Sequence, residues 1–423
     1  MKPILIEPYD TLFFRDSIPM SAGQGRGAGA RLPLPSTLHE AFRGSLLDAY
    51  GRSGEVAAFR PKSTTEKRIP RKGGWLGKGK TVISRGSKDF QSLRIAGPFP
   101  FLVPHPGPGD HPSGVLFPLP LDVIFAEDGT AHTLSLRRAD SSLHSGALPV
   151  IAVSPAPVRK EQTSGFLTAA ALSGYLGGDL SMLKSVVAWK DLFEEEYRIG
   201  VEIGPESSSA VQGQLYAATH ARPNERFRIL AWTGLKSPVR DEEEKLTNLS
   251  TLTLGGERRM ARLVRDAIHP VPVVPPLSTI PDSPGPVVVK WTLATSAVFT
   301  NGWLPGWCKD TTAQARPEGR VCLELKQGRA QLIAACLGKP VAFAGWDTVK
   351  SESKPTQLAV PAGSVYYFLC ENTATARDLA ALLHWRPRSD FYGEKGFGYG
   401  FACSQTTSPD VLDLAQSLFS SQP

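Results

Sequence analysis

Short apolar runs alternate with glycine- and proline-rich stretches along the whole chain. Near the amino terminus, residues 4–6 and 11–14 have the pattern of short strands around a break at Pro8. A helical spacing of apolar residues then runs to Tyr50, with Ser36 as the expected N-cap and Gly51 as the stop. The middle of the chain predicts helices over 164–174 and 189–196, followed by strands over 198–203, 213–218 and 226–232.

The second half repeats this style of organisation. Residues 287–299 have its clearest strand pattern, and 357–369 add an apolar strand after a turn at 361–363. The leucine and alanine spacing of 375–385 predicts a helix, and a glycine-rich stretch leads from it into a last strand. We therefore expect an α+β protein with long loop insertions. Its two domains are expected over residues 1–208 and 209–423.

The composition agrees with two domains and excludes several classes of protein. The chain has 423 residues, 41% of them hydrophobic, with 40 glycines and 36 prolines that favour turns and long loops. Its five cysteines contain no C-x-x-C pair, which argues against a disulfide framework or a structural zinc site. No signal-peptide pattern opens the sequence and no apolar run approaches about 18 residues. We expect a soluble, cytoplasmic protein with no membrane partner.

Positive charge is concentrated in one stretch. The whole chain has a net charge of +7, whereas residues 52–94 contain twelve lysines or arginines and three acids, a net charge of +9. Interspersed glycine and proline predict an inserted loop or β-hairpin there. Trp75 lies among its basic residues, a pattern that favours an arm contacting nucleic acid. A solvated surface segment is the alternative. The candidate contacts are Arg68, Arg71, Lys72, Lys78 and Lys80.

A glycine-rich stretch, SAGQGRGAGARLPLP, precedes the first predicted helix. Its backbone donors and guanidinium groups together suit phosphate, because both offer N–H groups to anionic oxygens. A surface loop without a ligand is the alternative interpretation. The candidate contacts in and before this stretch are Arg15, Ser21, Gly23, Gln24, Gly25, Arg26 and Arg31.

A second glycine-rich stretch, GEKGFGYGFA, spans residues 393–402. Glycine allows a positive φ and close approach of another backbone, and a lysine beside aromatic rings suits a phosphate–sugar chain. The alternative is a tight bend that leads into the last strand and buries Phe401. We expect Gly398→Val to weaken RNA binding with little change in melting temperature; the alternative predicts a loss of stability. The candidate contacts are Gly393, Lys395, Gly396, Phe397, Gly398, Tyr399 and Gly400.

Catalytic patterns are sparse. Only His39, near the start of the first helix, lies where a histidine could protonate a leaving 5′-oxygen of RNA. No H-x-x-x-H, H-E-x-x-H or G-x-S-x-G pattern occurs, so we expect no metal and no cofactor. Three functions stay open: an RNA-binding protein, a metal-independent endoribonuclease, and a protein-only scaffold that uses the basic arm.

Several stretches together resemble one family. They are DTLFFRD with the following glycine loop, PLPSTLHEAFRGSLL, RIGVEI with GQLYAA, LGGERR, GWD with PAGSVYYF, and the terminal glycine loop. In this order they resemble the RAMP superfamily of CRISPR–Cas proteins, over about residues 10–403. More narrowly, the chain resembles the subunit of the type III-B (Cmr) effector complex that caps the 5′ end of the guide RNA (crRNA).

The resemblance implies two ferredoxin-like (RRM-type) domains, the second with the glycine loop, and a protein that does not cleave RNA. Some relatives in the superfamily cut precursor crRNA, so the endoribonuclease alternative is a RAMP enzyme that processes precursor crRNA. It implies binding to the repeat-derived 5′ tag of the crRNA and indirect contact with target RNA. Its protein partners would be the large polymerase-like subunit and the backbone RAMP subunit, which it would bridge. The resemblance assigns RNA contact to Ser36, Thr37 and Arg43 of the first helix and to the four glycines of the terminal loop, Gly393, Gly396, Gly398 and Gly400. The remaining candidate RNA contacts are His39 in the first helix and Arg198, Arg258 and Arg259 in RIGVEI and LGGERR.

Overall fold

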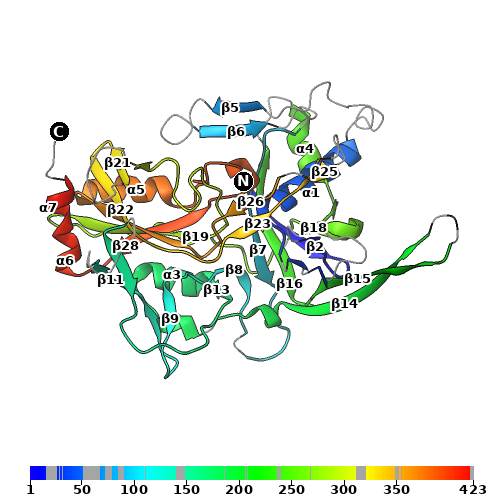
Figure 1. The fold of residues 1–423 in the computed structure, drawn as a ribbon, viewed down its shortest axis with the longest axis horizontal. Helices are drawn as coiled ribbons and strands as arrows, with labels where there is room; N and C mark the ends of the chain where they lie inside the picture. Colours follow the sequence, from blue (N-terminus) through cyan, green and yellow to red (C-terminus); the bar gives the residue numbers. More distant parts are fainter. Residues whose placement is uncertain are drawn as a thin grey trace.

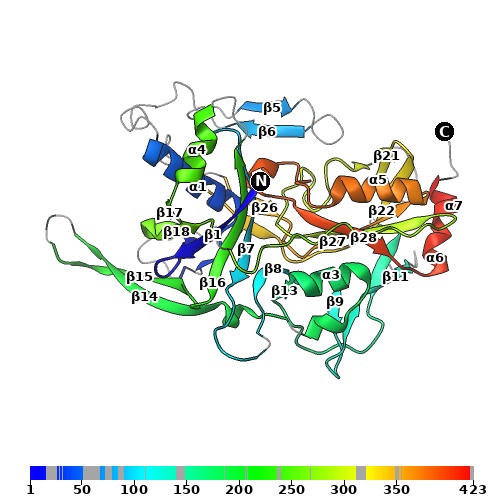
Figure 2. The ribbon, with the colours of Figure 1, turned by 180° about the vertical axis from the view of Figure 1, so that it is seen from behind.

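The fold is described here from a computed structural model (Figures 1 and 2). Two large antiparallel sheets, each with helices on its faces, make up the body of the protein. The structure describes residues 1–15, 26–27, 29–30, 32–50, 67–71, 79–83, 90–109, 111–139, 148–184, 186–204, 206, 208–235, 240–266, 268–310, 321–347, 352–353 and 355–419.

The first sheet is built from segments that are far apart in the sequence. In sheet order, its strands are β13 (Phe166–Thr168), β8 (Gly114–Pro118), β7 (Leu93–Leu102), β16 (Phe227–Leu235), β1 (Lys2–Pro8), β18 (Met260–Val264) and β17 (Thr251–Thr253). Strand β1 pairs antiparallel with both β16 and β18, and β16 pairs antiparallel with β7. The helices α1 (Pro35–Tyr50) and α4 (Arg240–Asn248) pack against one face of this sheet.

The second sheet repeats the central arrangement of the first. Its strands, in sheet order, are β20 (Lys309–Asp310), β21 (Val321–Leu325), β22 (Gly328–Cys336), β27 (Val365–Cys370), β19 (Val287–Leu293) and β28 (Gly400–Gln405). The order β22–β27–β19–β28 matches β7–β16–β1–β18, with the first strand in sequence flanked by the third and fourth. Helix α5 (Thr373–Leu383) covers one face, and α6 (Pro409–Leu412) and α7 (Leu414–Phe419) cover the other.

An aromatic layer joins the two sheets. Alternation along β1 points Ile4 and Ile6 toward α1, whereas Leu5 points to the opposite face and packs in a cluster with Phe401 of β28. Within this cluster the rings of Phe117 and Phe401 lie 5.0 Å apart, edge to face. Helix α3 (Ala169–Gly177) packs in the same layer. The two sheets therefore share a continuous buried core.

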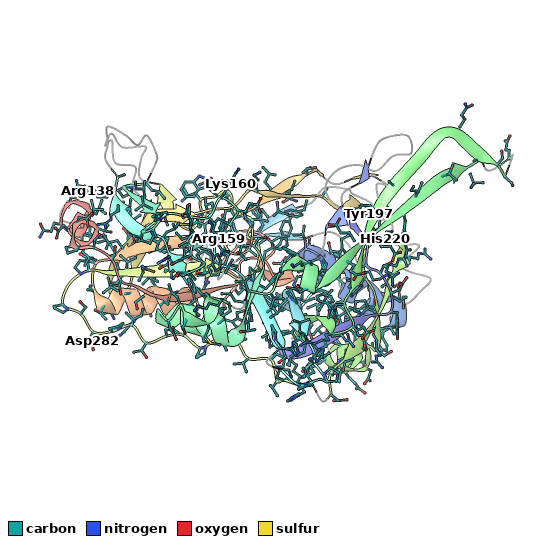
Figure 3. The ribbon with its side chains drawn as sticks, turned by 90° about the horizontal axis from the view of Figure 1, so that it is seen from below. Arg138, Arg159, Lys160, Tyr197, His220 and Asp282 are labelled. Carbon is teal, nitrogen blue, oxygen red and sulfur yellow. The ribbon has the colours of Figure 1, made fainter. Side chains whose placement is uncertain are left out.

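A long hairpin of β14 (Phe193–Ile203) and β15 (Ala210–Pro223) projects from the first sheet (Figures 1 and 3). The domain boundary expected near residue 208 falls in the turn of this hairpin. After the hairpin the chain returns to the first sheet through β16, β17 and β18, so that sheet extends to Val264. Long-range strand pairing, which local sequence patterns do not contain, accounts for the difference.

Smaller ribbons extend from these sheets. The basic stretch contains an antiparallel hairpin, as the glycine and proline pattern predicted. Short two-residue strands lie near the first glycine-rich stretch. The ribbons are β5 (Lys67–Arg71) with β6 (Gly79–Ile83), β2 (Phe14–Arg15) with β4 (Gly29–Ala30), β9 (Val123–Phe125) with β10 (Ala131–Thr133), β11 (Ser135–Arg138) with β12 (Val150–Val153), β23 (Val341–Phe343) with β26 (Gln357–Ala359), and β24 (Trp346–Asp347) with β25 (Glu352–Ser353). Strand β3 (Arg26–Gly27) pairs with β15.

Two local predictions were wrong in detail. Helix α1 begins at Pro35, a residue whose missing N–H suits the first helical position, so Ser36 lies inside the helix and is not its N-cap. The helix expected over 189–196 is only a 3₁₀ turn, Trp189–Asp191, after which β14 begins at Phe193. Pairing of β14 with β15 overrides the helical propensity of the three glutamates that follow Phe193.

Candidate functional site

Three arginines from distant segments meet at the base of the β14–β15 hairpin, and we call them the arginine cluster. They are Arg198 of β14, Arg222 of β15 and Arg259, which follows the 3₁₀ turn Gly256–Arg258. Arg198 and Arg259 were predicted from the sequence. The cluster forms because the hairpin register places Arg198 and Arg222 on one face, and the turn before β18 brings Arg259 beside them.

Carboxylates hold these guanidinium groups in place. Asp10 accepts hydrogen bonds from Arg222 at 3.3 Å and from Arg259 at 3.1 Å, and its Oδ2 lies 3.8 Å from Nη2 of Arg198. Glu196 binds both hairpin arginines, accepting from Nε of Arg198 and Nε of Arg222 at 2.7 Å each. In each pair Nη2 of the arginine approaches the same carboxylate oxygen as Nε, so two nitrogens of the planar guanidinium group are held at once.

The pKa values of these carboxyls reflect their surroundings. The backbone N–H of Thr11 and the nearby arginines lower the pKa of Asp10, outweighing the opposing effect of its partial burial. Hydrogen bonds from Arg198 and Arg222 lower the pKa of Glu196. Both carboxyls are therefore ionised at neutral pH, and the network is a set of charge-assisted bonds.

A buried histidine lies under the cluster. His220 of β15 is 0% exposed, stacks on Phe13 with ring centroids 4.8 Å apart, and has its Nδ1 3.3 Å from the hydroxyl of Thr11. Burial lowers its pKa, and Glu257 only partly opposes this. Figure 3 shows His220 at the base of the hairpin, near Tyr197.

One donor of the cluster has no acceptor. The Nε of Arg259 is buried and makes no hydrogen bond within the described part of the chain, although its Nη2 donates to Glu257 at 2.8 Å. Leaving a charged donor unpaired is costly in a folded protein. The neighbouring Arg258 is exposed, with a positive φ of 49°. Arg258, beside the cluster, therefore has a guanidinium group that an anionic ligand can reach.

The strands around the first glycine-rich stretch adjoin this cluster. Arg198 of β14 pairs with Ala218 of β15, and Ala218 pairs in turn with Gly27 of β3, so the three residues form one row across the sheet. Arg15 of β2 pairs with Gly29 of β4. The structure thus brings the backbone of Arg15 and of Arg26, two predicted contacts, to the same region as Arg198, Arg258 and Arg259.

Several predicted contacts cannot be placed as side chains. For Arg15, Arg26, Arg68, Arg71 and Lys80, only the backbone is described. The remaining predicted contacts of the two loops lie outside the described residues: Ser21, Gly23, Gln24, Gly25, Arg31, Lys72 and Lys78.

The first helix and the terminal glycine loop form a second meeting point. Nζ of Lys395 donates to Oε1 of Glu40 at 2.7 Å, and Nδ1 of His39 lies 3.5 Å from the same oxygen. Burial opposes ionisation of Glu40, but His39 and Lys395 outweigh it and lower the pKa of this carboxyl. His39 is only 6% exposed. Ser36, Thr37 and Arg43, the other predicted contacts of this helix, are partly buried.

The terminal glycine loop packs against protein, which corrects the expectation of bared donors and stacking rings. Phe397 and Tyr399 are 0% and 4% exposed, so their faces are not open to bases. The N–H groups of Gly396, Phe397 and Gly398 donate to the carbonyls of Gly393, Tyr392 and Ser296, and that of Tyr399 donates to the hydroxyl of Thr295. The bend interpretation therefore describes most of this loop.

The glycines of this loop are needed for close packing. A Cβ on Gly396 would lie 2.9 Å from the carbonyl oxygen of Gly97, and one on Gly400 would lie 2.4 Å from the indole nitrogen of Trp291. Gly393, by contrast, would meet only Pro387, at 3.3 Å. Gly396 and Gly400 are thus explained by contacts inside the protein, whereas Gly393 is not.

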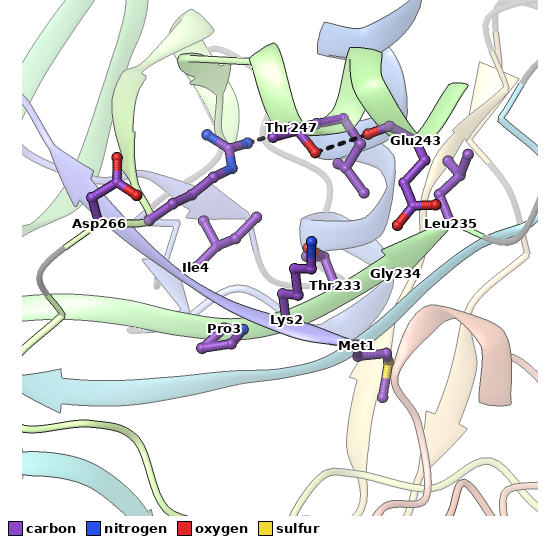
Figure 4. A pocket seen from close by; sticks show the side chains of 12 residues that line it. Met1, Lys2, Pro3, Ile4, Thr233, Gly234, Leu235, Glu243, Thr247 and Asp266 are labelled. Atoms are coloured by element: carbon purple, nitrogen blue, oxygen red, sulfur yellow. Dashed lines mark hydrogen bonds between the residues drawn. The ribbon is translucent and has the colours of Figure 1, made fainter. Parts of the chain in front are cut away.

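A pocket of about 880 Å³ lies between β1, β16 and α4 (Figure 4). Lys2 and Arg265 line it together with Glu243 and Asp266, and Arg265 donates to the carbonyl of Leu246 at 2.7 Å. Its positive and negative side chains are equal in number, so it lacks the excess positive charge that suits a phosphate group.

Within the ranges that the structure describes, no three histidine, cysteine or carboxylate side chains are placed to hold a metal ion. In those same ranges, every helix is too short or too polar to cross a lipid bilayer.

Sequence patterns missed some members of the site. Glu196 lies in β14, at the end of a segment where a helix was expected. His220 and Arg222 lie in β15, where the local pattern marks them only as polar residues alternating with alanine. Their meeting depends on the register of β14 with β15, which sets Arg222 opposite Glu194 and beside Glu196. Asp10 lies in the DTLFFRD stretch that contributed to the resemblance, and this was the one available signal.

With this geometry in view, we compared the chain with known proteins. A model of the family described as "CRISPR-associated protein (Cas_Cmr3)" matches residues 4–405. The chain belongs to this family. As a member of the Cas_Cmr3 family, it is a component of the type III-B Cmr CRISPR effector complex, which confirms the identification made from the ordered sequence motifs.

Solved structures similar to this Cas_Cmr3 family member include chains of type III-B and type III-A CRISPR complexes. A chain of the type III-B Cmr-beta complex bound to cognate target RNA and AMPPnP, in state 1, is 14% identical over 89% of this chain and 88% of that chain, with a TM-score of 0.43. A chain of the same complex bound to cognate target RNA is 13% identical over 86% of this chain and 86% of that chain, with a TM-score of 0.43. A chain of the Csm3–Csm4 subcomplex of the type III-A interference complex is 11% identical over 88% of this chain and 94% of that chain, with a TM-score of 0.38. No match was found among curated proteins.

Proposed function

We propose that this protein binds the 5′ tag of the crRNA within the Cmr complex, does not cleave RNA, and bridges the large polymerase-like subunit to the backbone RAMP subunit in the cytoplasm. The observation that carries the RNA-binding part is the arginine cluster. Arg198, Arg222 and Arg259 converge beside the strands that flank the first glycine-rich stretch.

The chemistry of the cluster suits a phosphate–sugar chain. Guanidinium groups already oriented by Asp10 and Glu196 lose little side-chain entropy when they bind, because the carboxylates fix their rotamers. The exposed Arg258 supplies donors for phosphate oxygens. The +9 stretch over residues 52–94 adds long-range attraction for a polyanion.

We also propose that the two large sheets belong to ferredoxin-like domains. In both, the strands follow the order second, third, first, fourth, and neighbouring central strands are antiparallel. In the first unit, α1 and α4 follow the first and third of these strands and cover one face, as in a split βαβ arrangement. In the second unit, α5 follows the third strand.

The test is RNA titration of the purified protein. A single-stranded RNA that begins with the repeat-derived tag is compared with one of equal length that lacks it, over a range of salt concentrations. Four to six phosphate contacts give a log–log salt slope of roughly −3 to −4, at about −0.7 per contact. We expect tighter binding of the tagged RNA; equal affinity for both RNAs, or a flat salt dependence, contradicts the proposal.

Arginine variants locate the interface. We expect Arg222→Ala and Arg259→Ala each to reduce RNA affinity about ten-fold and to make the salt slope shallower by about 0.7. Arg262→Ala is the matched control, because Arg262 of β18 is also exposed and bound to a carboxylate, that of Glu7, at 2.9 Å. An equal loss of affinity in all three variants would place the RNA elsewhere.

A further inference from the structure

An extended segment, residues 268–286, connects the first sheet to the second, and we call it the strap. It leads from β18 to β19 and has no helix or strand of its own. Pro275 and Ile280 are buried, whereas Val271 and Val273 are 72% and 55% exposed, so one side of the strap is packed and the other faces solvent. Because it pairs with no strand, the strap depends on side chains of other elements for its position.

Two side chains of helix α5 hold the second half of the strap. Oγ1 of Thr373, in the first turn of the helix, donates to the carbonyl of Ser283 at 2.9 Å and accepts from the N–H of the same residue at 3.2 Å. One turn later, Nη2 of Arg377 donates to the carbonyl of Ile280 at 3.1 Å. The strap therefore runs antiparallel to α5.

His384, which follows α5, attaches the first half of the strap through both nitrogens of its ring. Its Nε2 lies 2.9 Å from the carbonyl oxygen of Pro275, and its Nδ1 lies 3.3 Å from the backbone nitrogen of Ala402 in β28. A carbonyl oxygen can only accept a hydrogen bond, and a backbone N–H can only donate one. Nε2 therefore carries the proton and Nδ1 does not, so these contacts select one neutral tautomer of the ring.

The same histidine covers the edge of the second sheet. Strand β28 is the outermost strand of this sheet and pairs with β19 on one side only. On its other side, Ala402 donates to His384, and the N–H of Trp385 donates to the carbonyl of Gly400 at 2.6 Å. The ring of Phe401 lies 5.6 Å from the imidazole, edge to face. His384 thus joins the strap, the end of α5 and the edge of β28 at one point.

The surroundings of His384 favour its neutral form. Burial lowers the pKa of the ring, against the opposing effect of the hydrogen bond to Pro275. Three of the nearby charged groups are bound elsewhere: Arg377 to Asp282, Arg388 to the carbonyl of Leu382, and Lys290 to Asp122. No charged side chain in the described ranges shifts the pKa of His384. The charged and titratable groups on the elements around it are Arg377, Asp378, Arg386, Arg388, His269, Asp282, Lys290 and Cys403.

We propose that His384 is a pH-sensitive attachment, which holds the strap to the second sheet when it is neutral and releases the strap when it is protonated. A proton added at Nδ1 points at the N–H of Ala402, so it breaks that bond and opposes two donors. The released ring titrates near the ordinary histidine pKa of about 6.5. The attachment is therefore complete above this pH and weakens as the pH falls, because the released state binds the proton more readily. It is independent of the proposed binding of the 5′ tag.

Hydrogen exchange of the purified full-length protein tests this proposal. Exchange at Ala402 and at residues 271–280, corrected for the intrinsic rate at each pH, measures release of the strap. For a ring that titrates near 6.5 only after release, the released fraction rises by at most about 30-fold between pH 7.5 and pH 5. We expect a rise of at least five-fold. Unchanged protection over this range overturns the proposal.

A comparison within the sheet separates release of the strap from unfolding of the whole protein. Phe368 lies in β27, which pairs with a strand on each side, so its amide exchanges only when the second sheet opens. We expect the protection of Ala402 to be at least ten-fold lower than that of Phe368 at every pH. Equal protection of the two amides would mean that the strap leaves only on global unfolding, which overturns the proposal.

The variant His384→Gln removes the titration and keeps one donor and one acceptor in the side chain. We expect its exchange at Ala402 to change less than two-fold between pH 7.5 and pH 5. His269→Gln is the matched control, because His269 is an exposed histidine of the same strap, and it should keep the full rise. Equal rises in the two variants would show that another group titrates.

Nitrogen-15 NMR of the unmodified protein, labelled at histidine, gives a measurement that needs no folded His384 variant. The ring signals of His384 are assigned by elimination, from variants of the other histidines. At pH 7.5 we expect the tautomer protonated at Nε2, with a pKa below 6.5. The opposite tautomer, or a pKa at the ordinary value, contradicts the attachment whatever the behaviour of His384→Gln.

Discussion

Lys395 donates a hydrogen bond of 2.7 Å to Glu40, a residue 355 positions earlier in the chain. This contact ties the terminal glycine loop to the first helix. Beside it, Gly396 has a φ of 106° and packs against the carbonyls of Ile95 and Gly97 in β7. The loop thus fastens the second unit of the protein to the first, in addition to the shared aromatic core.

Replacement of Gly398 should destabilise the protein. Its φ is 78°, and a Cβ there would lie 2.2 Å from the backbone nitrogen of Ser389, far inside contact distance. We expect Gly398→Val to lower the free energy of unfolding by more than about 3 kcal/mol, since backbone strain alone costs about 1–3 kcal/mol. Urea unfolding measures the effect. This reverses the expectation from sequence that the loss would appear mainly in RNA binding.

Gly285→Val is the matched control. Gly285 also has a positive φ, 107°, but a Cβ there meets nothing within 4 Å. This variant therefore reports the strain without the collision, and we expect it to cost about 1–3 kcal/mol. A Gly398→Val protein as stable as the control, with weakened RNA binding, would restore the view that the loop lies on RNA.

Local sequence patterns predicted the elements that depend on neighbours in the chain. Helices α1 and α5 were found because apolar residues at helical spacing, such as Leu38, Phe42 and Leu46, need only one buried face. The limits of the first unit were not found. Strands β16 and β18 flank β1, although each lies more than two hundred residues after β1 in the sequence. No local pattern in the sequence indicates that pairing.

The candidate site shows the same division. The candidate contacts chosen from the sequence included Arg198 and Arg259, but the meeting of Arg222 with Asp10 depends on tertiary contacts. The aromatics of the terminal loop misled for a related reason. Alternating glycine and aromatic residues are typical both of a base-stacking loop and of a tight bend into a core strand, and only burial of Phe397 and Tyr399 distinguishes the two.

The purified protein should not cleave RNA. His39, the candidate acid or base, is 6% exposed and lies beside Glu40 at the junction with the terminal loop. A general acid must reach the leaving oxygen, directly or through one water. We expect repeat-containing RNA to stay intact on a denaturing gel, with or without divalent metal. Cleavage that disappears in His39→Ala would identify the protein as a processing endoribonuclease.

Stability should decline as the pH falls below about 6.5. Burial lowers the pKa values of His220 and His384 from 6.5 in the folded protein. The unfolded chain therefore binds protons at a higher pH than the folded one, so protonation favours unfolding as the pH drops through the unfolded pKa. We expect the free energy of unfolding to decrease from pH 7 to pH 5, above the range where carboxyls titrate.

The variant His220→Asn tests the source of this pH dependence. Asparagine keeps a polar group near the Thr11 hydroxyl but cannot take up a proton. We expect about half of the slope between pH 7 and pH 5 to disappear, whatever the absolute loss of stability, because His384 still titrates. A slope equal to that of the unmodified protein would show that His220 is not involved.

A buried ion pair joins the segment between β8 and β9 to strand β19 of the second sheet, and we expect it to contribute to stability. Lys290 of β19 and Asp122 are 3% and 0% exposed, with Nζ 3.3 Å from Oδ2, and the hydroxyls of Tyr175 and Tyr367 donate to the same carboxylate at 2.6 and 2.8 Å. Removal of one partner leaves a buried charge unpaired. We therefore expect Lys290→Met to cost about 3–5 kcal/mol in the free energy of unfolding.

A double-mutant cycle separates the pair from the cost of an orphaned charge. We expect Asp122→Asn/Lys290→Met to be less destabilising than the sum of the two single variants, because no unpaired charge remains in it. Lys245→Met is the control: Lys245 makes an exposed pair with Asp241 at 2.7 Å on α4, and such pairs contribute under about 1 kcal/mol. Strict additivity of the two buried substitutions in urea unfolding would mean that Lys290 and Asp122 do not stabilise one another.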